Sequence, residues 1–500
     1  MSDTDNSRVA KSSSSSYRHI LKYTSLFGGV QGLSILLAIV RNKLVATLLG
    51  KAGMGFISLL NSTIKLVSDS TNLGLSMSAV KHVSACYGDG EDQDTPADED
   101  SFLHAVMLIR FWSLLVGLFG MVVCIVFSPL LDRITFDWGD HVLHFILLSP
   151  VVFMTAVTGG ELTILKGTRR LKQLARISIY GIIGALLTTV PIYYFFRMSG
   201  VVPSLIIIAL IQMVITLGYS YHYYPLHLEF SISLLREGLQ MVRLGLAFVL
   251  SSVMASGADF IIRAYFNKHA GLDVVGLYNA GYMITIIYGG MLFSAMDSDY
   301  FPRLSSLSAI DKQFHDMVSR QIEVSLLITG PMVAALIVGM PILLPLLYAK
   351  DFADIIGMAQ LAAFSLLLRA VYLPMEYISL SRGDSHTFFV QEFFSCAMLV
   401  VGVITGYALC GLNGIGWGII AGSVIECLFV LVYTRIKYCY HISRKAVFFM
   451  LTLTTLTAVT YASIRLDSQI AYWCAGSTAV MLSCLFSWKM LKGGFRETQS

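Results

Sequence analysis

Charged side chains lie within stretches of this chain that are otherwise apolar enough to cross a membrane. A charge at the centre of a bilayer costs about 2.5–3.5 kcal/mol on insertion scales, so it normally faces water or a partner. Guanidinium and ammonium groups at this depth suit an anionic ligand such as a phosphate. The combination indicates a transporter with a polar, mainly cationic cavity. The candidate cavity residues are Arg41, Lys65, Arg263 and Arg369, and the candidate charge partners or cation-coupling residues are Asp69, Asp259, Glu376 and Glu426.

Two pairs among these residues have the spacing of ion pairs on one helix face. Asp259 and Arg263 are four positions apart with the acid first, which is the more favourable orientation. Lys65 and Asp69 are also four apart, in the reverse order. Either pair could line a cavity and take part in transport, or its two charges could only neutralise each other so that the helix inserts into the membrane. The spacing is compatible with both interpretations.

Arg41 has no acidic residue within one helical turn, and its neighbours are Asn42 and Lys43. At this depth it needs water, a bilayer defect or an anion, unless its long stem reaches the outer surface. We expect it to line the cavity, because Arg263 occupies a similar place in the second half of the chain.

Arg369 lies in the middle of its apolar stretch, and Glu376 follows after about two helical turns on the same face. The two could form a cavity pair or a strut between helices. Glu426 is also deep in its stretch, and it is a weaker candidate for coupling to a proton or a sodium ion.

Other charged residues lie nearer the expected ends of the apolar stretches. Arg110 is about two turns from a predicted cytosolic end, so its side chain is expected to reach the surface. Glu161 and Glu392 also lie near such ends and are expected to meet headgroup water. We assign no function to these three residues from the sequence.

The composition predicts the elements that position these charges. Hydrophobic residues make up 56% of 500 positions and charged residues 13%, against about 25% charged in soluble domains. A spanning helix needs about 20 apolar residues, and fourteen such stretches use nearly the whole length. The sequence therefore predicts an all-α polytopic membrane protein. The expected spans are 23–49, 54–80, 102–127, 143–165, 177–196, 202–222, 243–267, 276–300, 320–348, 354–380, 388–410, 414–434, 446–464 and 469–488.

The basic residues predict the orientation. They concentrate in the segments 166–176, 435–445 and 489–496, whereas the loops on the other side are short and poor in Lys and Arg. The excess of basic residues on the cytosolic side places both termini there. Residues 1–22, with a run of serines, predict a disordered cytosolic tail.

An internal repeat predicts two lobes. The stretch "RHILKYTSLFGGVQGLSILLAIVRNKLVATLLGKAGMGF" is echoed by "REGLQMVRLGLAFVLSSVMASGADFIIRAYFNKHAGLDVVGLY", and each contains an arginine followed by a glycine-containing turn. Duplicated transporters have their site between the two halves. The predicted parts are an N-lobe with helices 1–6 (23–222), a cytosolic linker (223–242), a C-lobe with helices 7–12 (243–434), helices 13–14 (446–488) and a cytosolic tail (489–500).

No enzyme motif accompanies this layout. The sequence contains no G-x-S-x-G, P-loop or H-E-x-x-H motif, and no cysteine forms a CxxC pair. His141 and His144 lack a third metal ligand nearby. We therefore expect neither an enzyme nor a bound metal or cofactor, with proton or sodium coupling left open.

Several segments resemble a known family. "AIVRNKLVATLLGKAGMGF" and "NLGLSMSAVKHVSA" are similar to the start of flippases for polysaccharides and lipid-linked oligosaccharides in the multidrug/oligosaccharidyl-lipid/polysaccharide exporter superfamily. "VVGLYNAGYMI", "DYFPRLSSL", "SLSRGDSH" and "GLNGIGWGIIAGSVIE" resemble its O-antigen translocase branch. The resemblance implies two six-helix lobes around a central cavity, plus two C-terminal helices. It also implies that Arg41 and Arg263 match the family's cavity arginines. Asn42 departs from the acid found in related peptidoglycan-precursor flippases, which favours the polysaccharide branch.

The implied activity is movement of an undecaprenyl-diphosphate-linked oligosaccharide from the inner to the outer leaflet by alternating access. The expected setting is the bacterial cytoplasmic (inner) membrane in lipopolysaccharide biosynthesis. The expected partners are the lipid-linked oligosaccharide, membrane lipids, a polymerase and glycosyltransferases, without nucleic acid. Two alternatives are a cation-coupled multidrug exporter of the same superfamily and a membrane enzyme that modifies glycans. The exporter would need acids for cationic drugs, and the enzyme would need larger external loops than this chain has.

Overall fold

A computed structural model describes most of the chain. It covers residues 3–74, 79–80, 83–84, 99–168, 170–226, 232–307, 309–465 and 468–497. Within these ranges the side chains of residues 3–35, 99, 171, 232–233, 240–248, 294–299, 465 and 493–497 are not described. Most of the acidic segment 86–101 therefore lies outside the described residues.

Long apolar helices dominate the described part, as the composition predicts. In a bilayer a helix satisfies all its backbone hydrogen bonds internally, which makes it the natural form for such segments. Eleven stretches are long and apolar enough to cross a membrane by length and composition. Three of them, Leu36–Thr71, Lys172–Tyr223 and Ser385–Tyr438, each cover two of the expected spans. The all-α polytopic architecture is thus confirmed for the described residues, and counting each of these three stretches as two spans gives the expected fourteen.

Glycines with positive φ break two of the longest helices. The helix α1 (Asp3–Thr71) is interrupted at Gly50, where φ is 68°. It also includes residues 3–22, for which the sequence predicts a disordered tail. The helix α14 (Ser385–Tyr438) is interrupted at Cys410 and Gly411, where φ of the glycine is 61°. A residue without Cβ adopts this conformation at no steric cost.

The two halves of α14 pack back against each other through small residues. A Cβ added to Gly406 would lie 2.1 Å from the carbonyl oxygen of Gly414, and one added to Gly418 would lie 1.8 Å from that of Gly402. Small residues at four-residue spacing allow such close backbone contact between membrane helices. The hairpin therefore brings positions at similar distances before and after the bend opposite each other.

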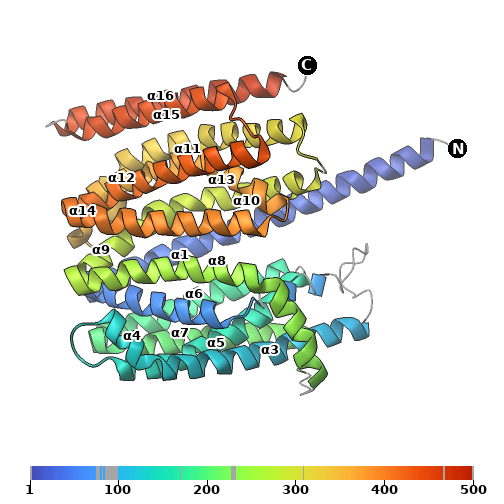
Figure 1. Cartoon of the computed structure of the whole chain (residues 1–500), viewed down its shortest axis with the longest axis vertical. Coiled ribbons are helices and arrows are strands. Elements are labelled where there is room, and N and C mark those ends of the chain that lie inside the picture. Colours follow the sequence, from blue (N-terminus) through green and yellow to red (C-terminus); the bar gives the residue numbers. More distant parts are fainter. Residues whose placement is uncertain are drawn as a thin grey trace. The chain divides into compact units, whose positions relative to one another are not determined.

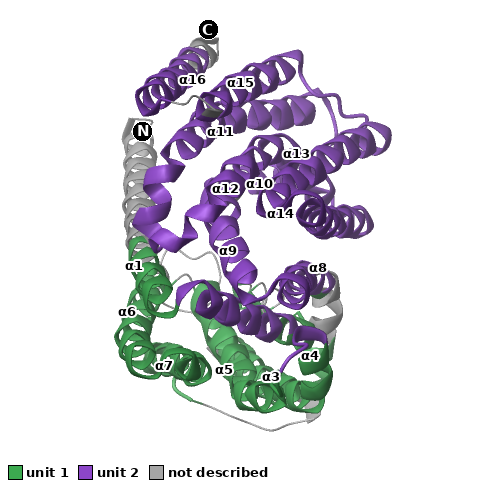
Figure 2. Cartoon of the chain, turned by 90° about the vertical axis from the view of Figure 1, so that its left-hand side faces the viewer, with its two compact units in different colours: residues 1–49, 67–133, 139–249 green, residues 50–66, 134–138, 250–500 purple. Residues whose placement is uncertain are grey.

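The chain divides into two compact units, which Figure 2 shows in different colours. Unit 1 comprises residues 1–49, 67–133 and 139–249. In it α3 (Glu99–Val126) packs on α5 (Val142–Gly167), α5 on α7 (Val201–Tyr223), and α7 on α6 (Leu171–Phe196). The turn η1 (Arg197–Gly200) joins α6 to α7, and α4 (Ser128–Thr135) follows α3.

Unit 2 comprises residues 50–66, 134–138 and 250–500. Its helix α11 packs against α13, α15 and α16, and α13 packs against α14 (Figure 1). The lobe boundaries predicted from the repeat stay a prediction. The elements of this unit are the second part of α8 (Ile232–Ala270), α9 (Leu272–Tyr282), the π-helix η2 (Met283–Tyr288), α10 (Gly289–Ser306), α11 (Lys312–Leu347), η3 (Lys350–Ile355), α12 (Ile356–Ala363), α13 (Ser365–Ser381), α14, α15 (Arg444–Ala462), η4 (Ser463–Arg465) and α16 (Gln469–Glu497).

Candidate functional site

Arg263 on α8 donates hydrogen bonds from all three nitrogen atoms of its guanidinium. Its Nε donates to Ser58 Oγ at 2.6 Å, and its Nη2 donates to Asn279 Oδ1 at 3.1 Å. Its Nη1 donates to the backbone carbonyl and the carboxylate of Asp259. The ion pair predicted from the spacing is therefore confirmed. All three nitrogen atoms are used within unit 2, so in this structure Arg263 joins α8 to α9 and to the second part of α1.

The exposure of the pair is uneven. The Arg263 side chain is 6% exposed and the Asp259 side chain 26%, so the carboxylate is the more accessible partner. A buried charge of this kind is tolerated when its partners satisfy it. An anionic ligand would have to displace Ser58 or Asn279 to reach the guanidinium. Its predicted role in substrate binding stays a prediction.

The glycines that follow the two repeated arginines meet in the structure. A Cβ added to Gly55 would lie 2.0 Å from the carbonyl oxygen of Leu272, and one added to Gly276 would lie 2.1 Å from that of Lys51. The helices α1 and α9 thus pack backbone to backbone beside Arg263. The two segments that the predicted repeat pairs are therefore in contact at these glycines, and the repeat itself stays a prediction.

Lys65 and Asp69 do not behave as the spacing suggests. Lys65 is exposed, and no ion pair joins it to Asp69 among the described side chains. The base precedes the acid here, which is the weaker orientation for a helical pair. The expected pair is therefore wrong, although both residues stay candidates for other roles.

Arg41 lies in unit 1 and is half-buried. It lies within electrostatic range of Tyr193 on α6, whose hydroxyl is 2.6 Å from Ser204 Oγ. Arg41 and Arg263 belong to different units, so each is described by itself. The proposed pairing of their roles stays a prediction.

Arg369 on α13 differs from Arg263 in its surroundings. It is half-buried, and its guanidinium lies over the ring of Phe293, 5.6 Å from the centroid. No carboxylate of the described residues lies within 4 Å of it. Glu376 and Glu426 act on it only over a longer range. Arg369 and Glu376 therefore do not form the close pair that the sequence predicts. Among the described residues, no carboxylate is close enough to pair with the N–H donors of Arg369.

Three carboxyl groups gather near Arg369. Glu376 comes from α13, and Glu392 and Glu426 come from the two halves of α14. Glu426 is 6% exposed, and Ser395 and Tyr372 lie close to its carboxylate. Because Arg369 can balance the charge of only one of the three carboxylates, the other carboxyl groups can bind a proton or a monovalent cation. No three His, Cys, Asp or Glu side chains in the described ranges are arranged to hold a metal ion.

Glu392 is a residue that the sequence analysis missed. The sequence predicts contact with headgroup water, but the structure places Glu392 half-buried beside Glu426. The bend at Gly411 is the reason, because it turns the two halves of α14 toward each other. The glycines on either side of this bend are the sequence signal that could have indicated the contact.

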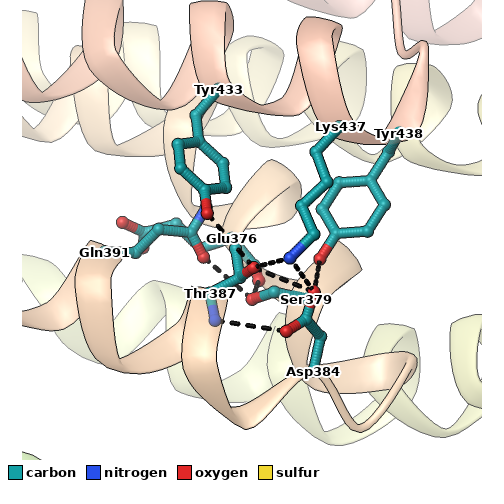
Figure 3. Close-up of polar contacts among 8 residues, drawn as sticks. All are labelled: Glu376, Ser379, Asp384, Thr387, Gln391, Tyr433, Lys437 and Tyr438. Carbon is teal, nitrogen blue, oxygen red and sulfur yellow. Dashed lines mark hydrogen bonds and ion pairs between the residues drawn. The ribbon is translucent and has the colours of Figure 1, made fainter.

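A polar cluster ties the two ends of α14 together, as Figure 3 shows. Asp384 accepts hydrogen bonds from the backbone N–H and the hydroxyl of Thr387, at 3.2 and 2.9 Å. It also pairs with Lys437 at 2.5 Å and accepts from the Tyr438 hydroxyl at 2.7 Å. Burial acts to raise the pKa of Asp384, but the hydrogen bonds from Lys437, Tyr438 and Thr387 together hold it well below its usual value. We call these four residues the α14 latch.

The backbone links the α14 latch to the helix that carries Glu376, because the N–H of Asp384 donates to the carbonyl of Ser379 at 2.9 Å. The Ser379 hydroxyl contacts the backbone carbonyl of Glu376 at 2.8 Å and the Gln391 side-chain oxygen at 2.8 Å (Figure 3). Gln391 precedes Glu392 directly in α14. Hydrogen bonds therefore connect the backbone that carries two of the carboxyl groups to the end of the hairpin.

Arg110 and Glu161 correct two further expectations. Both side chains are 3% exposed, and Arg110 Nε donates to Glu161 Oε1 at 2.9 Å. Ser220 donates to the same carboxylate at 2.6 Å, and Arg110 also donates to the carbonyls of Tyr224 and Pro225, each at 2.8 Å. The expected extension to the surface is wrong, because α5 and the end of α7 supply enough acceptors to hold the guanidinium inside. The pair fastens the start of the predicted linker to α3.

Comparison with protein families matches residues 44–357 to the family described as polysaccharide biosynthesis protein. The chain belongs to this family. Its matched region includes Lys65, Asp69, Asp259 and Arg263, whereas Arg369 and the carboxyl cluster lie beyond it.

Three proteins similar to this chain can be compared with it. The "Probable low-salt glycan biosynthesis flippase Agl15" of Haloferax volcanii is 21% identical over 458 residues, which covers 89% of this chain and 84% of the relative. The structure titled "Lipid II flippase MurJ, inward closed conformation" has a TM-score of 0.66 at 15% identity and covers 95% of this chain and 100% of that one. An inward-facing multidrug resistance MATE family transporter of the MOP superfamily has a TM-score of 0.67 at 15% identity, covering 81% and 94%. The protein is a polytopic membrane protein with the fold of this superfamily.

Proposed function

We propose that this protein is a flippase that moves a lipid-linked oligosaccharide from the inner to the outer leaflet by alternating access. The family match supports a role in polysaccharide biosynthesis, and two relatives are named as flippases. The substrate class is an undecaprenyl-diphosphate-linked glycan of the O-antigen type. The protein acts as a transporter, not as an enzyme.

The observation that carries the proposal is the state of Arg369. It is a half-buried cation within a spanning helix, with an aromatic ring on one side and no described carboxylate within 4 Å. A diphosphate carries about two negative charges and is well matched by a guanidinium in a low-dielectric setting. Arg41, Arg263 and Lys65 are the further cations of the proposed cavity.

The carboxyl cluster supports a coupling role. Movement of two negative charges outward is favoured by roughly 4–5 kcal/mol at an inside-negative potential of 100 mV. Return of the empty carrier needs no such charge movement, but Glu376, Glu392 and Glu426 could bind a proton or sodium ion in one state and release it in the other. Asp69 and Asp259 are further candidates for this role.

The proposed location is the cytoplasmic (inner) membrane of a bacterium, with both termini in the cytosol. The basic loops on that side support the orientation. A polymerase and glycosyltransferases of the same pathway are the proposed partners. The neighbouring steps would build the lipid-linked glycan on one leaflet and consume it on the other.

A second candidate function is cation-coupled export of drugs. It is favoured by one observation, the gathering of three carboxyl groups around one arginine, which suits a cationic ligand. The MATE transporter shares the fold at 15% identity, which supports the fold alone.

The test uses the full-length protein in vesicles that contain a fluorescent lipid-linked oligosaccharide in both leaflets. A membrane-impermeant quencher added outside measures how much of the label reaches the outer leaflet. We expect transport by the wild type and a loss of at least tenfold in Arg369→Gln. Arg435→Gln, which changes an exposed arginine at the end of α14, is the matched control and should retain transport.

Two outcomes separate the candidates. A protein that exports an organic cation and leaves the labelled glycan in place would refute the flippase and favour the drug exporter. Imposed proton and sodium gradients test coupling in the same vesicles. Glu426→Gln should remove any stimulation by the gradient, and stimulation that persists would exclude this carboxyl group.

A further inference from the structure

A cavity of about 990 Å³ lies between α10 and α11 in unit 2. One face of α11 lines it with residues spaced four apart, from Lys312 through Asp316 and Arg320 to Val324 and Ile328. Such residues follow one another along a single helix face. At 1.5 Å per residue, the row is about 24 Å long. The cavity is therefore a groove that runs along the helix and not a local hollow.

One end of the groove is cationic. Arg303 at the end of α10 joins Lys312 and Arg320 of α11, and Asp316 is the one acid among the described lining residues. The described lining therefore carries a net charge of +2 at this end. This is the end that the basic loops predict to be cytosolic.

The other end of the groove is apolar. Val324 and Ile328 are each 39% exposed, and Leu292 of α10 faces the same space. The remaining faces of α11 are covered by neighbours: Leu453 of α15 packs at Gly330, and a Cβ added to Gly476 of α16 would lie 2.9 Å from Val338. The groove is thus the face of α11 that the described residues of this unit leave uncovered.

The cationic end is held in shape by contacts that do not use the groove. Arg382 donates to the carbonyls of Leu307 and Ala309, at 2.8 and 3.0 Å, and lies over the ring of Phe314. These contacts fix the turn between α10 and α11. The positions of Arg303 and Lys312 on either side of this turn are therefore defined before any ligand binds.

We propose that this groove is a binding site for the carrier lipid in the cytosolic leaflet, with the diphosphate at Arg303, Lys312 and Arg320 and the first isoprenoid units along Val324 and Ile328. The site would take up the substrate before it enters the transport pathway. This inference rests on the proposed function and adds a place on unit 2 whose described lining includes none of Arg41, Arg263 and Arg369.

Charge and shape favour this occupant over an ordinary phospholipid. A lipid diphosphate carries about two negative charges, which matches the net charge of +2 on the described lining residues, whereas a phosphatidylglycerol carries one. A single prenyl chain also suits a groove with one row of apolar residues on α11. A water-soluble diphosphate would gain nothing from the apolar end.

The experiment maps the lipid directly on the full-length protein. The protein is placed in nanodiscs of zwitterionic lipid with an undecaprenyl diphosphate that carries a photoreactive group near the diphosphate, and the crosslinked peptides are identified by mass spectrometry. We expect crosslinks within 312–328 of α11. A tenfold excess of phosphatidylglycerol should not reduce them.

Variants of the charged lining residues should change the crosslinking in opposite directions. A basic residue near an anionic lipid surface contributes about 1 kcal/mol, or roughly fivefold in affinity. Arg303→Gln with Arg320→Gln should therefore weaken crosslinking about 25-fold, whereas Asp316→Asn should strengthen it. Arg435→Gln, outside the groove, should leave it unchanged.

Three results would overturn the site: crosslinks only outside α10 and α11, equal competition by phosphatidylglycerol, or no effect of the double variant. Transport measured in parallel separates this failure from failure of the proposed function. Wild-type protein that transports the glycan but crosslinks elsewhere refutes the groove alone. Wild-type protein that neither transports nor crosslinks refutes both.

Discussion

Loss of the Glu161 carboxylate should destabilise unit 1 severely. Glu161→Ala leaves the Arg110 guanidinium in a site where both side chains are 3% exposed, with only two backbone carbonyls as acceptors. Removal of one partner of a buried pair costs about 3–5 kcal/mol, because an uncompensated charge stays buried. Ser220 also loses its acceptor.

The same unit offers a matched control. His104 and Glu237 lie 2.7 Å apart, but their side chains are 44% and 47% exposed. An exposed pair contributes about 0–1 kcal/mol, so Glu237→Gln should have little effect. Arg110→Met combined with Glu161→Leu should recover much of the loss, because apolar residues of similar size can replace a buried pair.

The assay measures the free energy of unfolding in mixed micelles as the fraction of denaturing detergent rises. We expect Glu161→Ala to lose at least about 3 kcal/mol, Glu237→Gln less than about 1 kcal/mol, and the double variant to lie between them. If Glu161→Ala and Glu237→Gln cost the same, burial of the pair does not determine its contribution, and the reasoning is refuted.

Two further predictions concern unit 2. Gly276→Ala should destabilise the protein by about 1–3 kcal/mol, because a Cβ there would lie 2.1 Å from a backbone oxygen. Thermal stability is measured by the loss of folded protein in size-exclusion chromatography. Gly339→Ala, where an added Cβ has nothing within 4 Å, is the control, and equal losses in the two variants would contradict the close contact. Because the pKa of Asp384 is lowered in the folded state, its contribution to stability should be complete at neutral pH and should decline as the pH falls below about 4, the ordinary value. Asp384→Asn should therefore flatten the acid limb of the stability profile, and an unchanged profile would show that the α14 latch contributes nothing.

Local features of this protein could be predicted because they depend on short stretches. Apolar length and composition determine the spanning helices, whatever their neighbours. The pair of Asp259 and Arg263 could be predicted for the same reason, since residues four apart share a helix face. The same rule failed for Lys65 and Asp69, where the order of charges is less favourable and the structure leaves the lysine exposed.

Contacts between distant residues could not be predicted in this way. Arg110 and Glu161 are 51 positions apart, and Arg263 and Ser58 are 205 positions apart. Periodicity assigns each residue to a face of its own helix but does not say which helix that face meets. Proximity to a predicted helix end therefore suggested an exposed Arg110, although the neighbouring carbonyls hold it inside.

The amino-acid sequence by itself determined that the chain has many helices long and apolar enough to cross a membrane, because the hydrophobic effect and helix geometry act residue by residue. That its two halves are related stays a prediction. Only the tertiary structure decided which charged residues pair with each other. The bend at Gly411 turned Glu392 toward Glu426, and packing saturated Arg263 while it left donors on Arg369. These outcomes depend on how whole helices meet, and no local pattern encodes that.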